Sequence, residues 1–224
     1  MTIQHALRSL PWMLTPRCGI CHRNSAEGRL CHACQDELVQ LRASADAVYQ
    51  DNGIASRLIR TAKYGQHRAA VTIASQLWIE DLRTHRWDDI DLVTCVPPAP
   101  LRARWRGIHM PLQLATITSR ELGVPYQQLL RRSGYRRQRT RSRADRSRNA
   151  RTQYQVHPSA RYGSHARVLL IDDIRTTGAT LEACTDLLRR AGYIVDVRTF
   201  TTRAVQRGAQ RLGPQPLMSS LQIQ

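Results

Sequence analysis

The sequence is poor in aromatic residues and almost free of lysine. Only 5% of its 224 residues are aromatic, one is phenylalanine, and Lys63 is the single lysine. A core must therefore be built from leucine, isoleucine, valine and alanine. The 42% apolar content of a chain of this length suffices for one full-sized core with a small appendage, and two globular halves of equal size are not expected.

Long hydrophobic runs are also lacking. No segment approaches the roughly 20 apolar residues that a membrane-spanning helix needs. Residues 1–14 contain a short apolar stretch, but they lack the basic start and the small-residue cleavage site of a secretory signal. We therefore expect a cytoplasmic protein without a membrane span.

Acidic residues are few: 17 stand against 34 basic ones, which leaves a formal charge of +17. A GC-rich genome alone would account for the choice of arginine over lysine. Codon choice does not explain the surplus of positive charge. Positive side chains that neutralise the phosphates of a polyanion release its counterions, and long-range attraction speeds the association of the protein with that polyanion. The charge therefore favours a polyanionic partner.

Four of the six cysteines are close together. Cys18-Gly-Ile-Cys21 and Cys31-His-Ala-Cys34 form two CxxC pairs separated by nine residues. Each pair can bring two thiolates onto one metal ion, so the spacing predicts a closed, structural zinc site. Residues 1–45 have too few apolar side chains to fold by burial alone, and metal binding of about 10 kcal/mol would stabilise them. The alternative is a redox-active dithiol, which does not need two pairs this close.

Beyond the cysteines, helical and strand patterns alternate, which indicates a parallel α/β sheet flanked by helices. We expect a zinc-ribbon-like module over 1–45, the α/β domain over 46–208 and a flexible tail over 209–224. A run of ten arginines and one acid over 131–151 has no apolar period and is expected to be a basic loop. The predicted elements are helices over 53–83 (interrupted at Gly65), 110–122 and 179–190, and strands over 89–96, 124–130, 168–171 and 194–201.

The segment VLLIDDIRTTGATL, residues 168–181, carries the most information. Four apolar residues predict a buried strand, Asp172 and Asp173 stand at its carboxyl end, and a turn rich in threonine and glycine leads into a helix. Ligands of parallel sheets bind at this end of the strands. The small residues of the turn let backbone amides approach a phosphate, which the start of the helix also attracts. Because the two carboxylates suit the vicinal hydroxyls of a ribose, the segment predicts a sugar-phosphate site.

Other interpretations of these residues remain open at this stage. Asp172 and Asp173 can also cap a helix or hold Mg²⁺ directly, and threonine-rich turns occur as plain N-caps. Each residue taken singly has such an explanation. The contiguous pattern of strand, carboxylates and turn favours the sugar phosphate.

The same segment resembles the phosphoribosyl-diphosphate signature of type I phosphoribosyltransferases. The resemblance implies a type I phosphoribosyltransferase-like fold in which Asp172 and Asp173 contact the ribose hydroxyls. It also implies that phosphoribosyl diphosphate binds together with Mg²⁺. The residues that it assigns to the 5′-phosphate are Arg175, Thr176, Thr177, Gly178, Ala179 and Thr180.

Further residues resemble a subgroup, the ComF/GntX family, which is linked to competence and the uptake of transforming DNA. The resemblance extends from about Cys18 to Thr202, with departures at Ile108, His109, Met110 and Arg141. It implies a cytoplasmic protein that handles single-stranded DNA and meets proteins of the competence machinery. The residues that it adds as candidates for the diphosphate and its loop are Lys63, Val96, Pro97, Arg106, Gln138, Arg146 and Asn149. Lys63 would contact either the diphosphate or one of the two aspartates. The alternative is that a single lysine is present by chance.

Two functions follow from these patterns. A binding module would hold the sugar diphosphate as ligand while basic surfaces hold single-stranded DNA, whose phosphates attract arginine-rich segments. An active phosphoribosyltransferase would transfer the ribose to a nucleobase or related acceptor, but no catalytic acid or base can be named. The binding module is favoured because the polyanion surface is plain in the sequence and the acceptor pocket is not. The basic run can also be no more than an exposed, solubilising loop.

Overall fold

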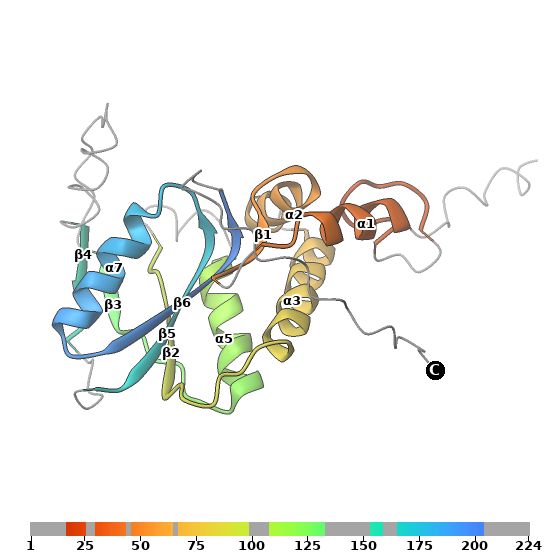
Figure 1. The fold of residues 1–224 in the computed structure, drawn as a ribbon. Helices are drawn as coiled ribbons and strands as arrows, with labels where there is room; N and C mark the ends of the chain where they lie inside the picture. Colours follow the sequence, from red (N-terminus) through yellow and green to blue (C-terminus); the bar gives the residue numbers. More distant parts are fainter. Residues whose placement is uncertain are drawn as a thin grey trace, which may run out of the picture.

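The chain folds around a four-stranded parallel sheet of order β1-β6-β5-β2, with a two-stranded antiparallel hairpin, β3-β4, beside it (Figure 1). The computed structural model describes residues 17–25, 30–43, 46–64, 67–98, 108–132, 153–158 and 165–203. The predicted parallel α/β fold is thereby confirmed. The elements are α1 (His32–Gln40), β1 (Ala47–Gln50), α2 (Gly53–Tyr64), α3 (Arg68–Arg83), β2 (Leu92–Cys95), α5 (Met110–Leu122), β3 (Leu130–Arg132), β4 (Tyr154–Val156), β5 (Arg167–Arg175), α7 (Ala179–Arg190) and β6 (Ile194–Thr202).

Helices cover both faces of the sheet. Successive side chains of a strand point to opposite faces, so Leu169 and Ile171 of β5 pack with α2, α3 and α5, whereas Val168 and Leu170 pack with α7 and the β3-β4 hairpin. Figure 1 shows α3 and α5 on one side of the sheet and α7 with the hairpin on the other. Because β5 is buried on both faces, its sequence reads as a continuous apolar run.

The strand β5 is longer than the sequence pattern predicts. The apolar run ends at Ile171, yet the strand continues to Arg175, because Asp172, Ile174 and Arg175 pair with Thr199, Thr201 and Thr202 of β6. Backbone pairing with a neighbouring strand does not require apolar side chains. Asp172 and Asp173 therefore lie within the last half of the strand.

The segment after α5 also differs from its prediction. A strand was expected over 124–130, but Tyr126 forms only an isolated parallel bridge to Val93 on the free edge of β2. The strand β3 begins at Leu130, and its Arg131 and Arg132 pair with Gln155 and Tyr154. The expected basic loop therefore starts later than residue 131, and its stretch over 133–151 lies outside the described residues.

The cysteine segment packs directly against the sheet domain. Cys18, Cys34 and Leu38 are buried in the same core cluster as α2, α3 and α5. The proposed boundary near residue 45 stays a prediction, and the tail over 209–224 lies outside the described residues. Within the described ranges, no helix combines the length and the hydropathy that crossing a membrane requires.

An ion pair is enclosed between α3 and β6. Arg198 is 1% exposed and Asp81 is 3% exposed. The Arg198 Nη2 lies 2.7 and 2.6 Å from the two carboxylate oxygens of Asp81, and its Nε lies 3.0 Å from one of them. Burying both charges is costly unless each stays paired.

We expect Asp81→Ala to lower the free energy of unfolding by about 3–5 kcal/mol, because it leaves the Arg198 guanidinium buried without its carboxylate. Urea unfolding measures the change. Arg83→Ala is the control: its partner is Glu121 and its side chain is 70% exposed, so the loss should stay below about 1 kcal/mol. Equal losses in the two variants would contradict the assignment.

Candidate functional site

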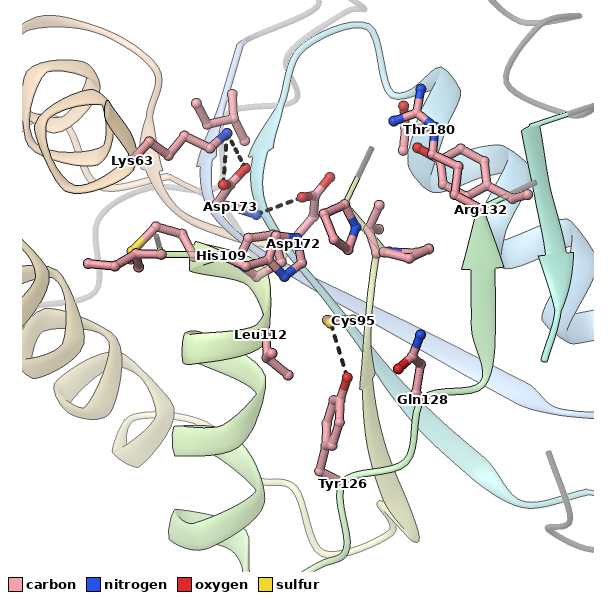
Figure 2. A pocket seen from close by; sticks show the side chains of 18 residues that line it. Lys63, Cys95, His109, Leu112, Tyr126, Gln128, Arg132, Asp172, Asp173 and Thr180 are labelled. Carbon is pink, nitrogen blue, oxygen red and sulfur yellow. Dashed lines mark hydrogen bonds and ion pairs between the residues drawn. The ribbon is translucent and has the colours of Figure 1, made fainter. Parts of the chain in front are cut away.

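A cavity of about 510 Å³ lies at the carboxyl ends of β2 and β5 (Figure 2). Its walls come from α2, β2 and the residues after it, the first turn of α5, the β3-β4 hairpin, β5 and the start of α7. This is the end of a parallel sheet at which ligands bind. The lining residues are Lys63, Cys95, Val96, Pro97, Pro98, Ile108, His109, Met110, Pro111, Leu112, Tyr126, Gln128, Arg132, Tyr154, Asp172, Asp173, Ile174 and Thr180.

Lys63 reaches the site from the last turn of α2 and pairs with Asp173. Its Nζ lies 2.8 Å from Oδ1 and 2.7 Å from Oδ2 of that carboxylate. The side chain of Asp173 is 4% exposed and that of Lys63 is 23% exposed. Of the two contacts that the sequence allowed for Lys63, the structure therefore shows the one with an aspartate.

Within the described residues no cation forms an ion pair with Asp172, although the nearby charge of Lys63 acts to lower its pKa. Its Oδ1 accepts a hydrogen bond from the backbone N–H of Asp173 at 2.9 Å. Burial, and then the neighbouring charge of Asp173, raise the pKa of Asp172 well above its ordinary range. A group that donates hydrogen bonds to this carboxylate, or a cation, would stabilise its charged form.

The turn after β5 leaves the start of α7 free of side-chain caps. Gly178 is the N-cap residue, with a φ of 81° that favours glycine and no side chain of its own to cap the helix, and the Ala179 N–H makes only a long contact of 3.5 Å with the Thr177 Oγ1. Among the described residues, the backbone amides of Thr176, Thr177 and Gly178 donate to no backbone carbonyl. The two aspartates are therefore not a capping pair, and the uncapped amides can receive an anion.

Most of the residues predicted for the phosphate form this turn without lining the cavity. Thr180 is the one that lines it. The guanidinium of Arg175 is paired with Asp46, at the start of β1. Thr176 is exposed, Thr177 and Ala179 are half-buried and Gly178 is buried.

Val96 and Pro97, the candidates for a diphosphate loop after β2, line the cavity. The other candidates of the predicted diphosphate loop cannot be placed. Arg106, Gln138, Arg146 and Asn149 lie outside the described residues.

Three residues on the α5 side of the cavity were not predicted as site residues. Burial lowers the pKa of His109, the charge of Asp173 opposes that shift, and Lys63 adds to it. Burial raises the pKa of Cys95 to about 12, although the Tyr126 hydroxyl, 3.4 Å from its Sγ, opposes the shift. At neutral pH this wall therefore presents an uncharged imidazole, thiol and phenol. In the sequence His109 was only a departure from a family pattern.

Arg132 and Thr180 form the opposite wall, next to the phosphate turn (Figure 2), and Tyr154 also lines the cavity. The Arg132 guanidinium lies 5.4 Å from the centre of the Tyr154 ring. Burial raises the pKa of the Tyr154 phenol. Because Arg132 belonged to an apparently featureless basic run, sequence reasoning did not single it out.

The four clustered cysteines are brought together as predicted. Their sulfur atoms all lie within 4.8 Å of one another, and none forms a disulfide. Burial alone would raise the pKa of Cys18, but backbone amides of Cys21, Cys31 and Ile20 lower it to about 6. Four convergent sulfur donors fit a tetrahedral zinc ion.

The segment that contains both the carboxylates and the turn has a recognisable family signature. Residues 112–212 match the family model of the phosphoribosyl transferase domain. The match supports the phosphoribosyltransferase superfamily for this part of the chain, which runs from α5 past the end of β6. No curated protein matches the chain in sequence.

Several solved phosphoribosyltransferases are similar in structure. Adenine phosphoribosyltransferase from Leishmania tarentolae is 16% identical, with 68% of this chain and 76% of that chain covered and a TM-score of 0.42. The enzyme from Thermoanaerobacter pseudethanolicus is 17% identical, with 75% and 87% covered and a TM-score of 0.42. Glutamine phosphoribosylpyrophosphate amidotransferase from B. subtilis is 23% identical, with 56% and 26% covered and a TM-score of 0.39. The chain thus spans about a quarter of the length of that amidotransferase.

We expect Asp172→Asn to stabilise the ligand-free protein at neutral pH. The folded-state pKa of Asp172 is raised, so the wild type is most stable below the ordinary aspartate pKa and loses stability as the pH rises through the folded value. The asparagine variant has no such loss. Its melting temperature should equal that of the wild type near pH 4 and exceed it at pH 7, by about 2–4 °C for each kcal/mol recovered.

Thermal unfolding at intervals between pH 4 and pH 8 measures this difference. Asp88→Asn, at an exposed acid, is the matched control and should follow the wild type throughout. A melting temperature of Asp172→Asn that stays level with the wild type, or falls below it at pH 7, would contradict the prediction.

Proposed function

We propose that the protein binds phosphoribosyl diphosphate in the cavity at the ends of β2 and β5. The observation that carries the proposal is the carboxylate of Asp172, which is only 8% exposed and lies in β5, the strand that leads through the turn into α7. Vicinal hydroxyls of a ribose donate hydrogen bonds to such a carboxylate. The uncapped amides of the turn provide the place for the 5′-phosphate.

The remaining charges fit the rest of this ligand. Lys63 is a cation at the edge of the cavity, and Val96 and Pro97 also line the cavity. Asp172 and Asp173 also fit Mg²⁺, because their oxygens are the donors that this ion prefers. Bound together with the ligand, Mg²⁺ would neutralise charge on the diphosphate. The match of residues 112–212 to a phosphoribosyl transferase domain supports the same ligand.

We expect the double variant Asp172→Asn with Asp173→Asn to bind phosphoribosyl diphosphate at least on the order of 100-fold more weakly than the wild type. Each substitution removes a charged acceptor, and such hydrogen bonds contribute about 1.5–3 kcal/mol. Calorimetry with the ligand and Mg²⁺ measures the change. Asp88→Asn should bind like the wild type. Unchanged affinity in the double variant would refute the site.

The finer proposal is a protein of the ComF type that acts in DNA uptake through single-stranded DNA. The formal charge of +17 and the ten arginines over 131–151 support a polyanionic partner. The order of the cysteines, Lys63 and the phosphate turn supports the subgroup. On this view the sugar diphosphate is a ligand or regulator, and proteins of the competence machinery are further partners.

The alternative is an active phosphoribosyltransferase. One observation favours it: the cavity continues past the two aspartates to a wall of uncharged groups, made by Cys95, Tyr126 and Gln128. Such a wall suits a flat, neutral acceptor better than a second phosphate. A nucleophile on that acceptor would attack the anomeric carbon of the ribose, with diphosphate as the leaving group.

Two assays separate the alternatives. If the basic run holds single-stranded DNA, neutralising five phosphates gives a log–log salt slope of about −3.5, and replacing arginines over 131–151 should flatten it. If the protein is a transferase, a screen of nucleobases with phosphoribosyl diphosphate and Mg²⁺ should release diphosphate. Absence of DNA association at low salt would remove the binding module, and absence of release with every base would remove the transferase.

A further inference from the structure

The helix α2 connects the cysteine cluster to the cavity. Cys31 is the N-cap residue of α1, and α1 packs against α2. Lys63 stands in the last turn of α2 and holds Asp173. One helix therefore touches the cysteine segment at its beginning, where it lies beside α1 (Figure 1), and the cavity at its end.

The contact at the beginning of α2 is specific. The Glu37 Oε1 of α1 accepts a hydrogen bond from the backbone N–H of Ile54 at 2.7 Å. A carboxylate is favourable at this position, because the first amides of a helix lack partners and carry the positive end of its dipole. Glu37 thus serves α2 as a cap supplied by another helix.

Gly53 makes this approach possible. A Cβ at residue 53 would lie 2.0 Å from Glu37 Oε1 and 3.5 Å from Leu41 Cδ1. Its φ of 44° also falls in the region that favours glycine. The first turn of α2 is therefore fitted closely against α1.

Between its two ends, α2 is packed as one unit. The side chains of one face are buried, none more than 4% exposed, and they belong to the main core cluster: Ile54, Ala55, Leu58, Ile59 and Ala62. Nine residues separate Ile54 from Lys63, a distance of about 14 Å along a helix. Because α2 is packed as one unit, a displacement of its first turn would be carried along the helix to the last turn, where Lys63 pairs with Asp173.

We infer that Glu37 is a positioning residue for Lys63: by capping α2 it sets the position from which Lys63 pairs with Asp173. The inference rests on the proposed function only where ligand affinity is the readout. The cysteine cluster, which fixes the start of α1, then contributes to the sugar-phosphate site without touching it.

Because Lys63 is the only lysine, reductive methylation with ¹³C-formaldehyde labels it and the N-terminal amine alone. Asp173→Asn gives the resonance of Lys63 without its partner. We expect Glu37→Ala to move the Lys63 resonance from its wild-type position toward that reference. Glu37→Gln should keep the wild-type resonance, because its amide oxygen accepts the same hydrogen bond, and Asp36→Ala, at an exposed acid on the same helix, is the control for the lost charge.

A second variant guards against failure of Glu37→Ala to fold. Gly53→Ala leaves the carboxylate in place but pushes it away from Ile54, and it should move the resonance in the same direction. A Lys63 resonance at the wild-type position in folded Glu37→Ala and Gly53→Ala would overturn the inference. This result does not depend on which ligand the cavity binds.

The affinity for phosphoribosyl diphosphate tests whether Glu37 acts on the site through Lys63. Glu37→Ala should weaken phosphoribosyl-diphosphate binding about fivefold, the change that corresponds to loss of a helix cap. In a Lys63→Met background the same substitution should leave the affinity unchanged, although it still lowers the melting temperature. An equal loss of affinity in both backgrounds would show that Glu37 acts by stability alone. If the wild type does not bind this ligand, the proposed function fails, and the resonance of Lys63 alone decides the inference.

Discussion

Two adjacent carboxylates buried at the end of a central strand are the constraint on which the site depends. A lone buried charge is costly, and two of the same sign cost more. Lys63 pairs with Asp173, whereas Asp172 accepts a hydrogen bond from the backbone N–H of Asp173 and its pKa is raised. The fold thus carries a cost in the ligand-free state that a bound ligand with hydroxyl donors removes. Buried charged groups that destabilise the ligand-free fold are typical of functional sites.

The sequence was sufficient where one local signal decides the structure. Both flanking helices, over 110–122 and 179–190, have the predicted bounds, because each has a clear period and is followed within two residues by a glycine of positive φ, Gly123 or Gly192. The cysteine cluster follows from spacing alone, since two CxxC pairs have few ways to converge. Asp172 and Asp173 were found because strand, carboxylates and turn are contiguous.

What the sequence missed depends on contacts between distant segments. The extension of β5 to Arg175 rests on pairing with Thr199–Thr202 of β6, which polar side chains do not reveal. His109 and Arg132 enter the cavity only because α5 and the β3-β4 hairpin fold toward the same strand ends. Arg175 looked like a phosphate ligand, but its guanidinium is paired with Asp46, which was not known to be near it.

The position of the cysteine segment shows why a small metal module and the sheet domain belong together. A module without a core of its own contributes Cys18, Cys34 and Leu38 to the core of its neighbour, so each part buries surface of the other. Its Glu37 also adds a carboxylate to the start of α2, since the first turn of that helix contains no acidic residue of its own. A metal ion held by the four cysteines would order α1 and, through Glu37, the first turn of α2. The other end of the same helix carries the lysine that pairs with a buried carboxylate, so such an ion would be coupled to the charge balance of the cavity.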